Sequence, residues 1–365
     1  MTSTIAAILR AHDADHSLES IELDDLRPDE ILVRIEAAGL CHTDLVPRNE
    51  LVANALCPIV LGHEGAGVVE SVGGDVQGVK VGDHVVLSFD SCGRCASCLH
   101  GEPAYCTSFR MVNTSGRRGD GSVAGTDSSG DRVNNRWFAQ SSFGHHAIAT
   151  ERNAVVVDRG LPFEILAPLG CGLQTGAGTV LNELDLQPGQ TIAITGVGAV
   201  GLAAVMAAKI AGASEIVVAD MHQSRLDLAV ELGATRTVLS PVPDLAAALR
   251  GGADGLDYVI DTTAVEGVVK AGLGALHRGG RSVMLGSAMT PFSLTTADLT
   301  GVKLGFVLEG SSLPQTFVPR LIEYWRSGQF PVERLIASYP LTSINDAERD
   351  MVSGSVIKPV LIPSH

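Results

Sequence analysis

The 365-residue chain carries 26 Lys and Arg against 41 Asp and Glu, which gives a formal net charge of −15. This acidity and an aromatic content of 4% argue against a nucleic-acid partner, because phosphates need clustered cations and bases need aromatic platforms. Hydrophobic residues make up 45% of the chain and charged residues 18%, so the chain is globular and long enough for two domains.

The N-terminus lacks the pattern of an export signal, because Arg10, His12 and Asp13 interrupt its mildly apolar start. Residues 191–208 are uncharged and long enough to imitate a membrane span. The glycines inside that stretch favour a buried strand, turn and helix instead. We therefore expect a cytoplasmic protein without a membrane segment.

Two cysteines and a histidine lie in glycine-bearing contexts that are far apart in the chain. Cys41 follows Gly39, His63 lies within Gly-His-Glu-Gly-Ala-Gly, and Cys171 has a glycine on either side. One His and two Cys form a ligand set that catalytic zinc sites use, with a fourth position left for water or substrate. Spacing alone leaves open that each is a core residue.

Four further cysteines follow the pattern C-x2-C-x2-C-x7-C. Thiolates two residues apart can turn onto one ion, and a fourth closes a tetrahedral site without an open position. The pattern predicts a structural zinc bound by Cys92, Cys95, Cys98 and Cys106. The alternatives are an iron–sulfur cluster, whose usual fourth spacing differs, and a zinc knuckle, which would lie among basic residues, whereas only Arg94 lies in this run.

The segment Thr107–Ser142 is long, polar and glycine-rich, which is typical of a binding lid or a surface excursion. Phe89 and Phe143 flank this part of the chain. They are candidates for the walls of a substrate pocket, with core packing as the alternative.

A dinucleotide-binding fingerprint begins at residue 196. A β-branched strand over 191–195 runs into Gly-Val-Gly-Ala-Val-Gly, then an alanine-rich helix and a second strand that ends in Asp220. Gly196 permits the tight turn, Gly198 lets the backbone approach the pyrophosphate, and Gly201 lets the helix pack on the strand. Asp220 would accept hydrogen bonds from the ribose hydroxyls and repel a 2′-phosphate, which favours NAD over NADP. Arg225 either reaches the ribose or phosphate or is a solvated helix charge.

Strands and helices continue to alternate after this fingerprint. The pattern predicts helices near 224–232, 244–250 and 265–276 and strands near 237–239, 256–261 and 282–285. Repeated strand–helix units indicate an α/β fold with a doubly wound parallel sheet.

Together these motifs resemble those of the zinc-dependent medium-chain alcohol dehydrogenases, over almost the whole chain. The C-terminal stretches 319–322, 330–331 and 357–361 resemble the aryl- and benzyl-alcohol branch. The resemblance implies a GroES-like, β-rich catalytic domain over 1–165 with a structural zinc lobe, completed by residues 308–365. A Rossmann NAD-binding domain over 166–307 would lie between them.

The same resemblance assigns roles at the catalytic zinc. Cys41, His63 and Cys171 match the zinc ligands, and Glu64 matches a carboxylate close to the metal. Asp44 matches the acid that hydrogen-bonds His63 and fixes its tautomer. Glu64 could otherwise be a plain barrel carboxylate.

Further roles concern the proton and the cofactor. Thr43 matches the hydroxyl that receives the alcohol's proton. His42 and Lys358 match contacts to the pyrophosphate, and Thr175 and Val200 match residues around the nicotinamide. The alternative for His42 and Lys358 is ordinary solvation.

One position departs from the family pattern. Many members carry a relay histidine where this chain has Val46, so the usual proton route lacks its last member. Val46 would also widen an apolar pocket. The chain is therefore predicted to oxidise primary aromatic or allylic alcohols to aldehydes, with zinc and NAD as cofactors.

Two other functions stay open at this point. A thiol-adduct formaldehyde dehydrogenase would need cations for the carboxylates of glutathione or mycothiol, and Arg117 and Arg118 are candidates. A non-catalytic zinc-bearing binding protein is the other, although such a module has no use for an open-site metal. By analogy with the family, a homodimer or homotetramer is expected.

Overall fold

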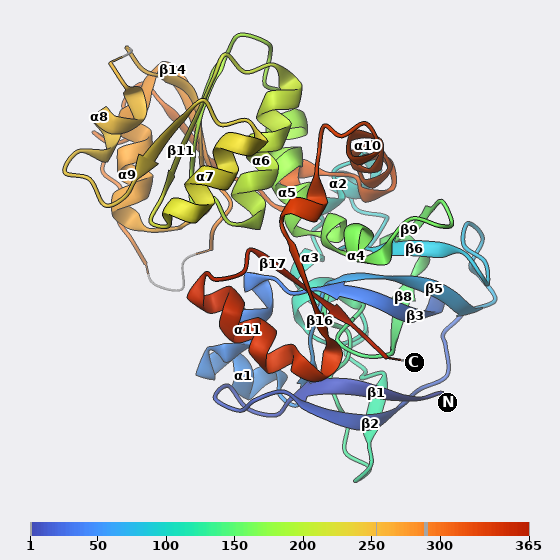
Figure 1. The fold of residues 1–365 in the computed structure, drawn as a ribbon. Coiled ribbons are helices and arrows are strands. Elements are labelled where there is room, and N and C mark those ends of the chain that lie inside the picture. Colours follow the sequence, from blue (N-terminus) through green and yellow to red (C-terminus); the bar gives the residue numbers. More distant parts are fainter. Residues whose placement is uncertain (1, 253, 288–290, 365) are drawn as a thin grey trace. The chain divides into compact units, whose positions relative to one another are not determined.

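The computed structural model describes residues 2–252, 254–287 and 291–364 (Figure 1). Contacts divide the chain into two units. The first comprises residues 1–171, 313–323 and 332–365, and the second comprises 172–312 and 324–331. Residues 166–171 thus belong to the first unit, whereas the sequence had placed them with the coenzyme domain.

The first unit contains two mainly antiparallel sheets. The strand order of the smaller sheet is β4-β1-β2-β7. Its strands are β1 (Thr2–Leu9), β2 (Ser17–Leu23), β4 (Ile59–Val60) and β7 (Gly125–Asp127). The first four residues of β1 include one buried position, and its last four residues are all buried in the core.

The larger sheet has the order β16-β17-β3-β5-β6-β9, and β8 also pairs with β3. Its strands are β3 (Glu30–Gly39), β5 (Glu64–Val72), β6 (His84–Leu87), β8 (His146–Thr150), β9 (Ala154–Val157), β16 (Ile336–Pro340) and β17 (Lys358–Ile362). The C-terminal strand β17 pairs with the end of β3, with Val360 opposite Gly39. The strand β17 thereby joins this sheet, while residues 308–312 and 324–331, which the expected completion of the catalytic domain included, belong to the second unit.

Short helices connect these strands. They are η1 (His42–Arg48), α1 (Glu50–Leu56), α2 (Ala96–Leu99), α3 (Phe109–Thr114), α4 (Phe163–Leu166) and α11 (Ile344–Ser353), and α10 (Pro314–Arg326) extends into the second unit. The segment 107–142 is therefore no plain loop, because it contains α3 and the sheet strand β7.

The second unit is a six-stranded parallel sheet in the order β12-β11-β10-β13-β14-β15. Its strands are β10 (Thr191–Thr195), β11 (Glu215–Asp220), β12 (Arg236–Leu239), β13 (Leu256–Asp261), β14 (Leu276–Met284) and β15 (Lys303–Phe306). Along the chain, β10, β11 and β12 extend the sheet in one direction, and β13, β14 and β15 then extend it from β10 in the other. This is the doubly wound topology predicted from the alternating pattern. That prediction is confirmed. No described helix has the length and hydropathy needed to cross a membrane.

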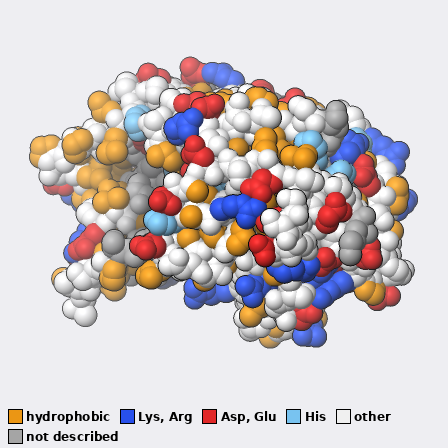
Figure 2. All heavy atoms as spheres, turned by 90° about the horizontal axis from the view of Figure 1, so that it is seen from below, with side chains coloured by type: hydrophobic (Ala, Val, Ile, Leu, Met, Phe, Trp, Pro, Cys, Tyr) orange, Lys and Arg blue, Asp and Glu red, His pale blue; other side chains and the backbone are white. Residues whose placement is uncertain are grey.

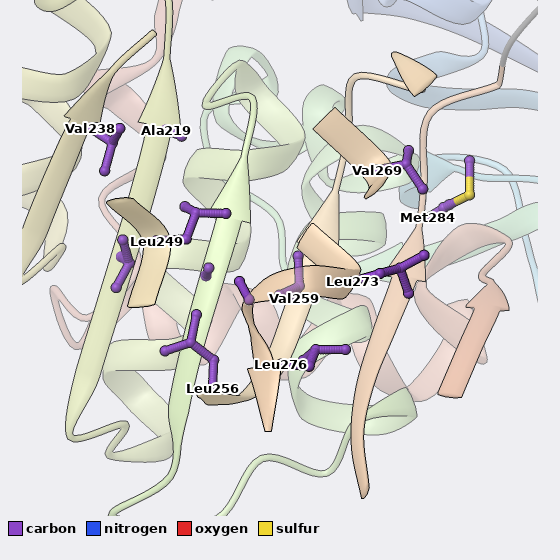
Figure 3. Packing of buried hydrophobic residues seen from close by; sticks show 12 residues of the cluster. Ala219, Val238, Leu249, Leu256, Val259, Val269, Leu273, Leu276 and Met284 are labelled. Atoms are coloured by element: carbon purple, nitrogen blue, oxygen red, sulfur yellow. The ribbon is translucent and has the colours of Figure 1, made fainter. Parts of the chain in front are cut away.

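Helices pack on this parallel sheet (Figure 1). They are α6 (Ala199–Ala211), α7 (Gln223–Leu232), α8 (Leu245–Arg250) and α9 (Glu266–Ala275). The helix α5 (Gly172–Gly178) packs on α6. Figure 3 shows the core formed with α8 and α9, where Leu249 and Leu273 lie with Leu256 and Val259 of β13. Burial of these aliphatic side chains stabilises the unit that presents the glycine-rich turn.

An ion-pair network anchors η1, the element after Cys41, to α11. The Arg48 guanidinium donates Nε and Nη2 to the two oxygens of Glu348, both at 2.9 Å. His16 Nε2 lies 3.2 Å from the same carboxylate. Burial would raise the pKa of Glu348, but the hydrogen bonds with His16 and Arg48 lower it to about 2.

We predict that Glu348→Gln lowers the free energy of unfolding by about 2 kcal/mol at pH 7. Because the folded-state pKa is depressed, the stabilisation is present above the carboxyl's ordinary pKa and lost as the pH falls toward 2. Denaturant unfolding over a pH series should show the gap to wild type narrowing below about pH 4.5. The exposed Glu22→Gln serves as control, and a gap independent of pH would contradict the assignment.

Candidate metal and dinucleotide sites

Four potential ligands converge in the first unit. One donor atom each from Cys41, His63, Glu64 and Cys171 lies within 4.8 Å of the others. Cys41 follows β3 and Glu64 begins β5, and the register of these antiparallel strands sets Gly39 opposite Glu64. The two motifs therefore meet at one end of the strand pair.

The His63 ring is held in an orientation that suits a metal ligand. Its Nδ1 lies 2.8 Å from Asp44 Oδ1, whose carboxylate also accepts the backbone N–H groups of Gly62 and Cys41 at 3.1 and 3.2 Å. The other ring nitrogen, Nε2, is buried and has no hydrogen-bond partner among the described residues. A buried imidazole nitrogen rarely lacks a partner, so this atom fits a zinc ion.

The electrostatics favour the ligating form of the thiol. A hydrogen bond with Cys171 lowers the pKa of Cys41 well below its ordinary value, against burial, and the charges of Lys358 and His63 lower it further. Zinc is bound by thiolates rather than thiols. Two Cys and one His, with Glu64 close by, thus match a zinc site that keeps a position for substrate.

Glu64 and Lys358 form a buried ion pair next to these ligands. Lys358 Nζ donates to the two Glu64 oxygens at 3.0 and 2.8 Å and to Leu40 O at 3.2 Å, and both side chains are at most 2% exposed. Burial raises the pKa of Glu64, although the Lys358 charge acts against it. Because its three donors have acceptors in the first unit, the structure lends no support to the pyrophosphate contact predicted for Lys358.

The remaining residues of the Cys41 motif lie on η1. Thr43 Oγ1 is 4.0 Å from Cys41 Sγ, so its hydroxyl is beside the ligand set. Val46 is half-buried and His42 is exposed. The proton and pyrophosphate roles of Thr43 and His42 stay predictions.

The four clustered cysteines form the second candidate metal site. The Sγ atoms of Cys92, Cys95, Cys98 and Cys106 lie within 4.8 Å of one another, and none is in a disulfide. Hydrogen bonds from the backbone of Cys98 and Thr107 lower the pKa of Cys95 to about 5, which favours its thiolate. Four thiolates without another ligand fit a closed, structural zinc.

The glycine-rich turn of the second unit is open at Gly198. Gly196 has φ +82°, and a Cβ on Gly201 would lie 2.1 Å from Gly196 O, so both positions require glycine. A Cβ on Gly198 would meet no atom within 4 Å. Because Gly198 caps the 13-residue α6, this open space lies at a helix N-terminus, where phosphates bind favourably.

Asp220 and Arg225 lie beyond this turn. The Asp220 carboxylate accepts the N–H of Val197 at 2.8 Å and that of His222 at 2.9 Å, which ties the end of β11 to the turn. Arg225 Nε is buried without a hydrogen-bond partner among the described residues. Each Asp220 oxygen keeps acceptor capacity for a ribose hydroxyl, and the ribose and phosphate contacts of both residues stay predictions.

Thr175 and Val200 lie on neighbouring helices, α5 and α6. A Cβ on Gly176 would lie 2.0 Å from Val200 O, so α5 and α6 touch through glycine. Both side chains are half-buried. Their proximity agrees with a shared role near one ligand, and the nicotinamide contact remains a prediction.

The structure also places the predicted pocket residues. Phe143 is fully buried, packed beside Gly62 and edge-on to His16, which is a core position. Phe89 is 3% exposed and lies 5.8 Å, ring to ring, from Phe109. Phe143 is therefore a core residue and not the pocket wall that was predicted. Phe89 belongs to a group of aromatic side chains.

That aromatic group extends to the metal site through a residue that sequence reasoning missed. The ring of Phe138 lies 4.6 Å from that of His63, 6.4 Å from Phe109 and 5.5 Å from Trp137. No local motif marks Phe138, and the only signal was its place beside Trp137 and shortly before Phe143 in a chain with few aromatic residues.

Comparison with known proteins agrees with these sites. Residues 27–154 match the model of the alcohol dehydrogenase GroES-like domain, and residues 199–323 match that of zinc-binding dehydrogenases. The geraniol dehydrogenase of Castellaniella defragrans is 42% identical over 99% of this chain and 98% of its own. The crystal structure of benzyl alcohol dehydrogenase from Acinetobacter calcoaceticus is 38% identical, with a TM-score of 0.94 over both whole chains. An S-(hydroxymethyl)glutathione dehydrogenase of Saccharomyces cerevisiae is 32% identical over 98% of this chain and 95% of its own.

Substitution of one ligand in each metal site should have different consequences. Cys41→Ala should remove about one zinc per chain and abolish turnover while the fold is retained, because the open site adds less to folding. Cys95→Ala should remove the other zinc and cause misfolding or aggregation, because a closed site contributes folding free energy directly. Metal analysis and circular dichroism measure both effects. Equal loss of structure in the two variants would contradict this division.

Proposed function

Because the chain belongs to the zinc-dependent medium-chain alcohol dehydrogenases, we propose that it oxidises primary allylic and aromatic alcohols to aldehydes with NAD. The observation that carries the proposal is the convergence of donor atoms from Cys41, His63 and Cys171, with an aromatic ring 4.6 Å from that of His63. The reaction is reversible, with the aldehyde as substrate in the other direction.

Different residues of the site would serve different steps of alcohol oxidation. Two electrons leave the alcohol carbon with hydride, and the hydroxyl proton leaves separately. Zinc, when bound, supplies a Lewis acid that makes loss of that proton favourable near neutral pH. Cys41, His63 and Cys171 would hold it. Thr43, whose Oγ1 lies 4.0 Å from Cys41 Sγ, would accept the alcohol's proton while its own hydroxyl proton passes to water.

The second unit would hold the cofactor that takes the hydride. The open turn at Gly198 and the N-terminus of α6 would bind the pyrophosphate. The Asp220 carboxylate would hydrogen-bond the ribose hydroxyls and repel the 2′-phosphate of NADP. The protein thus supplies position and charge, and NAD carries the redox change.

The aromatic group supports the substrate class. The chain has only nine Phe and two Trp, yet Phe89, Phe109, Phe138 and Trp137 follow one another in ring contacts that begin at His63. Planar, polarisable side chains favour a planar aryl or alkenyl group over a short alkyl group. The names of the geraniol and benzyl alcohol dehydrogenases point to the same class.

One of the two cations proposed for the thiol-adduct alternative is paired within the protein. Arg118 is 6% exposed and donates to both oxygens of Glu30 at 2.8 Å. Arg117 Nε donates to Asn134 Oδ1 at 3.1 Å. The Glu30 pair occupies the Arg118 charge, whereas Arg117 is exposed and its guanidinium donates to a neutral amide. The adduct would thus have one cation in place of two, which supports a free alcohol as substrate.

A substrate panel followed by NADH formation tests the proposal. We expect kcat/KM for benzyl alcohol and geraniol to exceed that for ethanol by at least roughly a hundredfold, because an aryl group buries about 100 Å² more apolar surface. Cys41→Ala provides the background rate. Comparable efficiency on ethanol and benzyl alcohol would reject the substrate class. Turnover of formaldehyde only with glutathione or mycothiol would favour the alternative.

The assembly and compartment are also part of the proposal. β15 is an edge strand of the parallel sheet, and its Phe306 is 47% exposed, which supports pairing with a second copy. Light scattering would measure whether a homodimer or homotetramer forms. Figure 2 shows acidic and basic side chains interspersed on one face. The formal net charge of −15 supports the proposal that nucleic acid is not a partner. None of the seven cysteines is in a disulfide, which supports a reducing, cytoplasmic location.

A further inference from the structure

The segment 137–143 carries unusual backbone conformations beside the metal site. Phe138, Ala139 and Ser141 have φ angles of 50°, 56° and 55°. Side chains with a Cβ rarely adopt this left-handed region, so surrounding contacts must impose it. Such strain is most often retained where it positions functional groups.

This segment forms hydrogen bonds with the backbone on both sides of His63. Ser142 N donates to Gly62 O and Phe143 N to Leu61 O, both at 3.0 Å. The side-chain amide of Gln140 bridges the next residues along the chain, from His63 to Gly65 at the start of β5. Its Oε1 accepts from Gly65 N at 2.9 Å, and its Nε2 donates to His63 O at 2.9 Å.

Gln140 is fully buried and uses both ends of its amide. The second Nε2 hydrogen points to Ser88 O at 3.1 Å. These partners fix the amide orientation, because an N–H faces the oxygen and two carbonyls face the nitrogen. Only an amide of this length satisfies one donor and two acceptors here.

Ser88 extends this connection to a second zinc ligand. Its Oγ donates to Gly170 O at 2.6 Å, one residue before Cys171. The chains are close at this point, since a Cβ on Gly170 would lie 2.2 Å from Leu87 O. A continuous hydrogen-bonded path therefore runs from His63 through Gln140 and Ser88 to Gly170.

We propose that Gln140 and Ser88 are positioning residues that fix the separation between His63 and Cys171 and so determine how tightly the open site holds zinc. Neither residue ligates the metal. Asp44 restrains the edge of the His63 ring and Phe138 covers its face, whereas the Gln140–Ser88 path restrains the backbone that carries it. The inference rests on the proposed zinc chemistry and is independent of the substrate.

Zinc release to a chromogenic chelator tests this proposal on the full-length zinc protein. Gln140→Met removes both functions of the amide at similar size, and Ser88→Ala removes the hydroxyl that donates to Gly170 O. The open-site zinc is identified as the kinetic component missing from Cys41→Ala. We expect each variant to release that zinc roughly 10- to 100-fold faster, as outer-shell changes do at other metal sites, and to leave the four-cysteine zinc unchanged.

A matched control separates positioning from general stability. Asn345 also clamps a peptide through its amide, accepting from His16 N and donating to His16 O, both at 2.9 Å. Asn345→Leu should lower thermal stability without changing zinc release. The d–d spectrum of cobalt in the open site should shift in Gln140→Met and Ser88→Ala only.

Two results would overturn the proposal. One is unchanged open-site release in Ser88→Ala and Gln140→Met with a stability loss like that of Asn345→Leu. The other is equal acceleration of both zinc components, which would indicate general loosening. If Gln140→Met does not fold, Ser88→Ala decides by the same criteria. An enzyme that prefers ethanol would reject the substrate proposal and leave these zinc measurements interpretable.

Discussion

Gly39 lies opposite Glu64 in the antiparallel pairing of β3 with β5, and this register sets how close Cys41 comes to His63. The approach is so tight that a Cβ on Gly39 would lie 2.0 Å from Glu64 Oε2. Any side chain at this position would displace the carboxylate that pairs with Lys358. The ligand set, the buried ion pair and the Asp44 hydrogen bonds all depend on this one strand pairing.

Charge compensation is the second constraint at the site. Two thiolates and a carboxylate in a buried place need positive charge, because burial of unpaired ions is costly. Lys358 supplies one charge from the C-terminal strand, and zinc would supply two. The pairing of β17 with β3 therefore brings Lys358, the first residue of β17, to the metal site.

Much of this arrangement could be predicted from local sequence, but not all. The four-cysteine site and the Gly196 turn depend on short spacings, and the structure shows both clusters. The convergence of Cys41, His63 and Cys171 followed only from family resemblance, because strand register decides it. The segment 107–142 reads as a loop, yet Arg118 pairs with Glu30 from a distant strand. Gln140 and Phe138 act through tertiary contacts that leave no local pattern.

Anomalous diffraction from crystals of the purified protein at the zinc edge tests the central claim most directly. Two peaks per chain are predicted, one enclosed by the four clustered cysteines and one bound by Cys41, His63 and Cys171 with a position left for a small oxygen ligand. A single peak at the four cysteines, or a second ion fully enclosed by protein atoms, would contradict the account.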